Sequence, residues 1–384
     1  MLFLTRYFGV TGSDAERSVM NEQAIIEAIV ERVLVMQAKA AAQQHRPLRR
    51  GTHAKGICVQ AQFEVFDVTV GRDPALAARL AKGIFAKPGV YPAVVRFANS
   101  DSKVNSDFKA DVRSLSFSVD LARNGAAVFG ANAVSRQDFS LQNATTLPIN
   151  DSTAFLAIMR LLTASNPAAG LWSLPFKDKL RVLRTLTLVQ FQTHQKIKPY
   201  QQLRYWSNVP FRHGPNDVVK QSAIPSPANS AKPLQRSNPN GLQDELVRHV
   251  KEDSQMSSFD FGLQLLDAEK MTYWGKRQDA NFWIENASVE WHETESPFHP
   301  VGRLTLLSNS QLTQADGEVT SFDVTGNAAP DSTPVGSINR ARRQGELASR
   351  SARMSASGNG AQLQENLRSN RASGSPLFHT TKVP

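Results

Sequence analysis

The chain has 384 residues, of which 41% are apolar and 20% are charged, and this composition is that of a globular protein with a sizeable core. Its net charge of +10 favours anionic partners, but the basic clusters lack the interleaved aromatic residues of a nucleic-acid platform. A single cysteine, Cys58, excludes an internal disulfide framework and predicts a reducing, cytoplasmic location. No apolar run reaches the length of a membrane span. Together with the lack of aromatic residues in the basic clusters, this leads us to expect no clear nucleic-acid or membrane partner.

The first half of the chain predicts one long helix followed by strands. Ile25, Ile29 and Val33 recur at helical spacing, which predicts an amphipathic helix over residues 14–44. After it, alternating apolar residues predict strands over 60–70, 91–98, 112–121 and 126–130, with a short helical pattern over 73–85. This region is therefore expected to be mainly β.

The second half mixes helices, strands and polar loops. Helical patterns cover 151–163, 177–192 and 241–252, strand patterns cover 258–266, 282–291 and 303–307, and a long loop is expected over 222–240. Strands with helices gathered around them predict an α+β fold built on an antiparallel sheet or barrel. We expect an N-terminal helical arm over 1–50, a barrel and helical domain over 51–354, and a flexible tail over 355–384.

One short segment concentrates residues that can carry chemistry. It runs from Arg50 to Gly56, reads Arg-Gly-Thr-His-Ala-Lys-Gly, and places His53 between an Arg and a Lys at the head of a predicted strand. An imidazole can move a proton near neutral pH, because its unperturbed pKa is about 6.5. On its own, a histidine beside a strand is more often a structural residue than a catalytic one.

Further segments, taken in order, give the chain a specific resemblance. Beside the His53 segment they are Val95-Arg-Phe97, Asp111-Val-Arg-Ser-Leu-Ser-Phe117, Gln137-Asp-Phe-Ser-Leu-Gln-Asn143, Tyr205-Trp-Ser-Asn-Val-Pro-Phe-Arg-His-Gly214, Ala287-Ser-Val-Glu-Trp291 and Gly336 to Ser349. From about residue 50 to about residue 353, the chain resembles the catalase-like haem proteins, in particular their compact bacterial branch. The resemblance implies a catalase-like antiparallel β-barrel with surrounding helices.

The resemblance also implies a haem b cofactor and a distal catalytic pair. His53 is at the position of the distal histidine, where it would take a proton from a bound peroxide and return it to the leaving oxygen. Asn143 is at the position of the distal asparagine, where it would donate a hydrogen bond that orients the peroxide. These two residues are the predicted catalytic residues.

Three arginines and one aromatic residue are predicted to hold the cofactor. Arg50, Arg96 and Arg342 match positions that bind the haem propionates, and a planar guanidinium suits a buried carboxylate. Phe155, on the helix after Asn143, would stack on the porphyrin. The alternative for Arg50 and Arg96 is surface or structural ion pairing, and the alternative for Phe155 is ordinary core packing.

One departure from the family pattern concerns the metal. The family holds its iron with a Tyr four residues after an Arg on a C-terminal helix, and counting four residues from Arg342 gives Glu346. None of the five tyrosines lies in that stretch. Glu346 could ligate iron as a carboxylate, and the axial ligand is one of the features that tune haem reactivity.

Three functions follow from these patterns. The first is a haem-dependent enzyme that acts on hydrogen peroxide or on organic (lipid) hydroperoxides, peroxidase-like rather than a high-turnover catalase. The second is a catalase-fold protein without haem or activity that serves as a binding or structural module. The third rests on the +10 charge alone and is a protein that binds an acidic macromolecule. A homo-oligomer is compatible with each of them.

Overall fold

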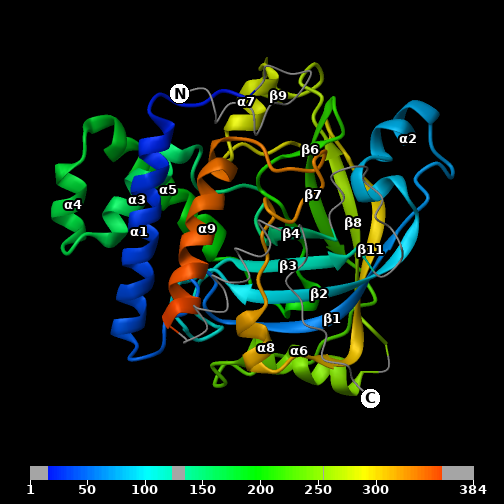
Figure 1. Cartoon of the computed structure of the whole chain (residues 1–384), viewed down its shortest axis with the longest axis horizontal. Helices are drawn as coiled ribbons and strands as arrows, with labels where there is room; N and C mark the ends of the chain where they lie inside the picture. The colour runs from blue at the N-terminus through cyan, green and yellow to red at the C-terminus, as the bar shows by residue number, and fades with distance from the viewer. Residues whose placement is uncertain (1–15, 123–134, 254, 357–384) are drawn as a thin grey trace.

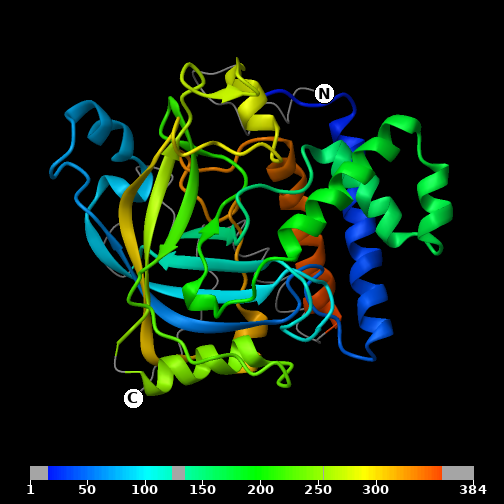
Figure 2. The same cartoon turned by 180° about the vertical axis from the view of Figure 1, so that it is seen from behind.

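A β-barrel with helices along one side makes up the structure, a computed structural model that describes residues 16–122, 135–253 and 255–356 (Figures 1 and 2). The helices are α1 (Glu22–Gln43), α2 (Pro74–Leu80), α3 (Ser152–Thr163), α4 (Pro167–Ser173), α5 (Phe176–Thr193), α6 (Gly241–Glu252), α7 (Ala280–Glu285), α8 (Gln314–Val319) and α9 (Ser337–Ala356). The strands are β1 (Gly56–Val65), β2 (Gly89–Asn99), β3 (Arg113–Asp120), β4 (Arg136–Gln142), β5 (Tyr205–Trp206), β6 (Phe211–His213), β7 (Asp217–Pro225), β8 (Ser258–Leu265), β9 (Thr272–Tyr273), β10 (Lys276–Arg277) and β11 (Phe298–Gln311).

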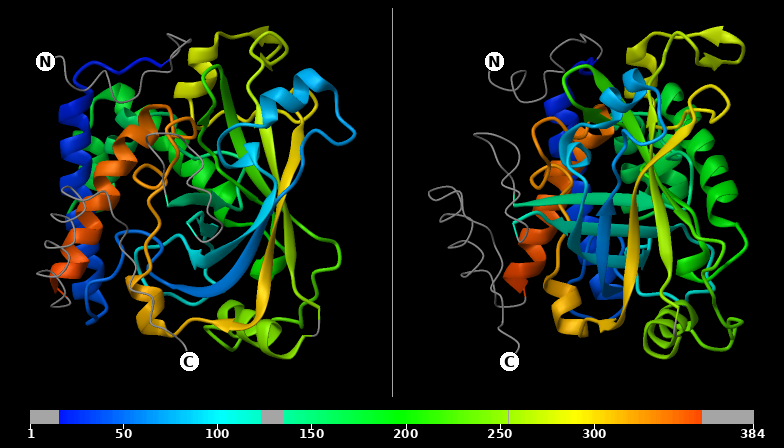
Figure 3. Two further views of the ribbon diagram at one scale, coloured as in Figure 1. Left: turned by 45° about the vertical axis from the view of Figure 1, so that its right-hand side comes forward. Right: turned by 90° about the vertical axis from the view of Figure 1, so that its right-hand side faces the viewer.

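Eight antiparallel strands close the barrel. Their order is β5-β4-β3-β2-β1-β11-β8-β7, and β5 pairs with β7 to complete the circle, while β6 adds to β7. Figure 3 shows the long strands β1 and β11 crossing the molecule, with α2 near one end of the barrel and α6 near the other. The predicted α+β fold with an antiparallel barrel is therefore confirmed.

The barrel interior is filled by aromatic side chains. Phe117 and Phe139 stack with ring centroids 4.5 Å apart, and Phe261 meets Phe139 edge-on at 5.1 Å. Phe63 lies 5.5 Å from both Phe117 and Phe261. An eight-stranded barrel is just wide enough for side chains to fill it, and these rings fill this one, so a ligand site is expected outside the barrel.

The outer face of the barrel carries polar residues, because side chains alternate along each strand. Arg96 on β2 pairs in register with Ser116 on β3, which in turn pairs with Ser140 on β4. These three residues form a polar row on the outside, while Phe117 and Phe139 point inward. Both faces of these strands are therefore used, one for the core and one for a site.

Helices α1, α3 and α9 cover that polar face. Helix α1 packs against both α3 and α9, and Figure 1 shows α1 and α9 side by side next to the barrel. Arg340, near the start of α9, pairs with Glu16 at 2.7 Å, Glu22 at 2.9 Å and Glu285 at 3.1 Å. This ion-pair cluster fixes the start of α9 against the N-terminal helix.

Several details differ from the sequence expectations. The predicted strand over 282–291 is wrong: helix α7 covers its first residues as far as Glu285, and the rest is turn and irregular backbone. Asp279 caps α7 by accepting a hydrogen bond from the Phe282 N–H at 2.9 Å. The predicted strand over 126–130 lies outside the described residues, as does nearly all of the predicted tail over 355–384. No helix in the described ranges is long and apolar enough to cross a membrane.

Candidate functional site

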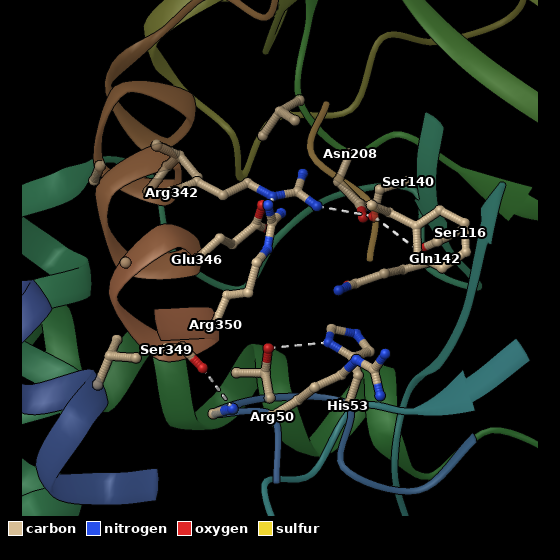
Figure 4. A pocket seen from close by; sticks show the side chains of 18 of the residues that line it. Arg50, His53, Ser116, Ser140, Gln142, Asn208, Arg342, Glu346, Ser349 and Arg350 are labelled. Carbon is tan, nitrogen blue, oxygen red and sulfur yellow. Dashed lines mark hydrogen bonds and ion pairs between the residues drawn. The ribbon is translucent and has the colours of Figure 1, made fainter. Parts of the chain in front are cut away.

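A cavity of about 300 Å³ lies between the outer face of the barrel and helices α1, α3 and α9. Figure 4 shows His53 and Arg50 on one side, Arg342, Glu346 and Arg350 projecting from α9, and Ser116, Ser140 and Gln142 on the barrel wall. Its volume is at the lower end of the range for small-molecule sites. The walls combine apolar side chains with a concentration of charge.

The His53 segment is positioned by two close approaches of the backbone. The Gly51 N–H donates to the Ser349 Oγ at 2.9 Å, and a Cβ at Gly51 would meet that oxygen at 3.0 Å. A Cβ at Gly56 would lie 2.5 Å from the Arg96 guanidinium, so Gly56 leaves room for this side chain to cross the strand. Arg96 then donates to the His53 carbonyl at 2.8 Å. The segment is thus joined to both α9 and the barrel wall.

His53 has a left-handed backbone conformation, with φ at +59°, and its side chain faces the cavity. Its Nδ1 lies 3.0 Å from the Thr52 Oγ1, and its Nε2 lies 3.4 Å from the Ser100 Oγ. Burial, followed by the positive charges of Arg96, Arg342 and Arg50, lowers the pKa of His53 from 6.5 to about 3. At neutral pH, His53 is therefore a neutral imidazole that can accept a proton.

This lowered pKa predicts both a titration and a stability effect. In the ligand-free protein, the imidazole resonances of His53 should stay at their neutral positions down to about pH 5. Because the unfolded chain binds this proton near pH 6.5 and the folded chain only near pH 3, the free energy of unfolding should fall as pH drops through that window.

The expected slope from this one group is at most about 1.4 kcal/mol per pH unit. His53→Gln should assign the NMR resonance by its loss and should make the acid dependence of unfolding shallower. An ordinary titration of His53 near pH 6.5 would contradict the electrostatic description of the cavity.

Helix α9 supplies the opposite wall. Arg342 donates from Nε to the Glu346 Oε1 at 2.6 Å and from Nη2 to the Ser140 Oγ at 2.8 Å. The Ser116 Oγ donates to the same Ser140 oxygen at 3.3 Å, which continues the contact along the polar row. The carboxylate of Glu346 is partly exposed to the cavity and is held in place by Arg342.

The cavity has a strong positive charge. Its described lining residues include five arginines, which are Arg50, Arg96, Arg342, Arg350 and Arg353, against the single acid Glu346. Apolar side chains complete the wall, among them Ile29 on α1, Phe155 on α3 and Leu147, which precedes α3. A ligand that combines anionic groups with an apolar body fits this lining, because guanidinium groups pair with carboxylates while the apolar side chains exclude water.

The structure brings six of the seven predicted site residues to this cavity. Those that line it are Arg50, His53, Arg96, Phe155, Arg342 and Glu346. Asn143, the predicted peroxide-orienting residue, is not among the described lining residues. Its Oδ1 instead accepts a hydrogen bond from the Arg113 N–H at 2.6 Å, and its own N–H donates to the Arg113 carbonyl at 2.9 Å. Asn143 thus joins the ends of β3 and β4.

Sequence reasoning missed other polar residues of the site. Asn208, which donates to the Ala144 carbonyl, and Gln142 both line the cavity. Arg350 and Arg353 follow Glu346 by four and seven residues, which places them on the same face of α9. Helical spacing from Arg342 could have identified both arginines, whereas Asn208 gave no pattern of its own.

The described residues hold no group of three or more His, Cys, Asp or Glu side chains that could bind a bare metal ion. The closed antiparallel barrel, its filled interior and the cavity beneath α9 define a protein with a catalase-like fold.

The comparisons with known proteins support the same fold. No sequence-family model matches the chain, and no curated protein matches it. A fungal catalase aligns at a TM-score of 0.57 and 15% identity, over 83% of this chain and 61% of that chain. Catalase A from Saccharomyces cerevisiae aligns at 0.58 and 16%, over 84% and 65%. A bacterial catalase aligns at 0.57 and 17%, over 97% and 70%. The chain thus spans less than two thirds of the length of the first two catalases.

Proposed function

We propose that this chain binds haem b in the cavity and reacts with hydrogen peroxide or organic hydroperoxides, in a peroxidase-like manner rather than as a high-turnover catalase. The observation that supports the proposal is that two opposite walls of the cavity carry complementary groups. A neutral imidazole, His53, lines one wall, and on α9 Arg342 holds the carboxylate of Glu346. The likeness of the fold to catalases adds support.

The residues present fit this cofactor in charge, polarity and donor type. Haem b carries two propionates on an apolar macrocycle, and the arginine-rich cavity offers guanidinium partners such as Arg50 and Arg96. Phe155 and Ile29 supply apolar contacts for the ring. Glu346 would offer a carboxylate oxygen to the iron in place of the phenolate that catalase-like proteins use.

When bound, haem would supply the iron centre at which the O–O bond of a peroxide is cleaved. The role of His53 is to take the proton of an incoming peroxide at its unprotonated ring nitrogen and return it to the leaving oxygen. Anionic carboxylates in the cavity would offset the arginines that lower the pKa of His53, which would make the imidazole a stronger base. Arg342 orients the carboxyl group of Glu346 by donating a hydrogen bond to its Oε1.

We expect a peroxidase-like activity because a carboxylate, that of Glu346, would replace a phenolate as the protein's donor to the iron. A carboxylate donates less electron density than a phenolate, and the axial ligand is one of the means by which a protein sets haem reactivity. Glu346 is also paired with Arg342 at 2.6 Å, which reduces its donor strength further. We therefore expect slow turnover of hydrogen peroxide relative to a tyrosine-ligated site.

A second function is favoured by that same ion pair. Because Glu346 already has a partner in Arg342, the cavity could instead bind an organic anion with an apolar body, such as a fatty-acid carboxylate, without any iron. This function is that of a catalase-fold protein without haem that serves as a binding module.

Titration with haemin distinguishes the two. The purified chain should bind one haemin per chain with a change in the absorption spectrum, and Arg96→Gln should weaken binding by roughly tenfold through loss of a charge-assisted contact. Arg303→Gln is the matched control, since Arg303 is a half-exposed arginine on β11 that pairs with Asp260 instead. Absence of haemin uptake, together with binding of oleate that depends on Arg96, would support the second function and overturn the first.

A further inference from the structure

Helices α3, α4 and α5 pack together beside α1, and α4 lies on the side of α1 away from the barrel (Figures 1 and 2). Large apolar side chains are exposed on these helices: Trp172 at 77%, Phe176 at 73% and Phe191 at 76%. No residue of α4 is buried, and only Val182 and Thr185 are buried among the 18 residues of α5. Single exposed apolar residues are ordinary, but a concentration of them marks an interaction surface.

Most of the exposed apolar residues of α5 lie on one face. Phe176, Leu180, Leu183 and Phe191 fall within an arc of about 80° at 3.6 residues per turn, and Leu186, which is 39% exposed, lies about 60° beyond the edge of this arc. The two buried residues of α5, at 182 and 185, lie on the other side of the helix, where α5 packs against α3. A helix that buries one face against the protein and presents a second apolar face to water lacks a partner for that second face within the described structure.

Basic residues border this face. Lys177, Lys179 and Arg184 flank it, and the Lys179 Nζ lies 5.3 Å from the centre of the Trp172 ring. Asp178 is the only acid between residues 160 and 194, and it already pairs with Arg181 at 2.8 Å. A second copy of the chain would bring the same positive charges against these, so the surface is suited to a negatively charged partner.

We propose that the α4–α5 hairpin binds the surface of a membrane that contains anionic lipids, with the face of Phe176, Leu180, Leu183 and Phe191 in the interfacial layer. Aromatic and aliphatic residues on one face with Lys and Arg at its borders are the features of helices that lie in a bilayer interface. The basic residues add attraction to anionic headgroups. The inference rests on exposure and charge, and it holds whether or not the cavity binds haem.

Co-sedimentation of the full chain with vesicles tests this surface. The chain should bind vesicles of phosphatidylcholine with phosphatidylglycerol, should bind pure phosphatidylcholine vesicles more weakly, and should lose affinity as salt is added. Phe176→Ser with Leu180→Ser should lower the partition coefficient by at least about tenfold, because each buried apolar side chain contributes strongly to transfer.

Two exposed tryptophans provide the matched comparison. Trp172→Ser, in the hairpin, should reduce vesicle binding, whereas Trp274→Ser should not, although Trp274 is 89% exposed. Since these side chains are exposed, circular dichroism should show that all the variants stay folded. Absence of binding to anionic vesicles, or equal loss in both tryptophan variants, would overturn the proposal. So would a Phe176-dependent dimer in lipid-free solution, which would make this face an interface between copies.

Discussion

Replacing His53 with alanine is expected to reduce peroxide turnover by the haemin-loaded protein by roughly 10²- to 10⁴-fold, the usual contribution of a positioned general base. The reason is geometric: His53 faces the cavity with a neutral ring, held by the Gly51–Ser349 contact on one side and by Arg96 on the other. Haemin affinity should change little, because His53 is placed to move a proton and the arginines are placed to hold the cofactor. Stopped-flow kinetics with hydrogen peroxide and with an organic hydroperoxide would measure the loss.

Thr52→Val serves as a control for this variant. It removes the hydroxyl 3.0 Å from the His53 Nδ1 but leaves the ring, so its effect on turnover should be much smaller. Turnover that survives His53→Ala unchanged would remove His53 from its proposed role and would point to chemistry away from this wall of the cavity.

Replacing Glu346 with tyrosine should shift the absorption spectrum of the bound ferric haem and raise peroxide turnover by at least roughly tenfold. That change corresponds to a barrier lower by about 1.4 kcal/mol. The physical reason is that a phenolate at this position donates more electron density than the carboxylate. Arg342, which now donates to the Glu346 Oε1, would be available to stabilise the phenolate.

Two further substitutions define what Glu346 does. Glu346→Gln keeps the size but removes the charge, so haemin affinity should fall while the fold is retained. Arg343→Gln, one residue from Arg342 on α9 but not among the described cavity-lining residues, should leave the spectrum unchanged. An identical spectrum for the wild type, Glu346→Tyr and Glu346→Gln would show that position 346 does not contact the iron.

The fold and the position of the His53 segment were largely predictable from sequence. In the segment Arg50–Gly56, glycine is required where the backbone approaches Ser349 and Arg96. The alternation of strand residues also indicated which side chains enter the barrel core. Because the segments that resemble the family follow the same order along the chain, they predicted one barrel.

Other parts of the site could not be predicted, because they depend on contacts between segments distant in sequence. The Asn143 side chain accepts a hydrogen bond from the Arg113 backbone N–H, and Asn143 is not among the described residues that line the cavity. Pairing of this kind is decided by tertiary structure, which overrides local propensity. Helix α7 is a different case, because its cap is local: Asp279 accepts a hydrogen bond from the Phe282 N–H, and an Asp before a helix is a signal that the sequence carries.

Helix α5 shows a different limit. Its leucines at 180 and 183 have helical spacing, which is usually the sign of a core-facing stripe. The structure exposes them at 52% and 51%, because α5 packs against α3 through the residues at 182 and 185 instead. Periodicity identifies an amphipathic face, but it cannot say whether protein or an external partner covers that face.

The most direct test of the central claim is to locate iron in the haemin-treated protein by anomalous X-ray diffraction at the iron edge. We expect a single strong peak inside the cavity, bounded by His53 on one side and Glu346 on the other, with the arginines of the wall around the propionates. Haemin bound elsewhere on the surface, or crystals without an iron signal after treatment with excess haemin, would contradict it.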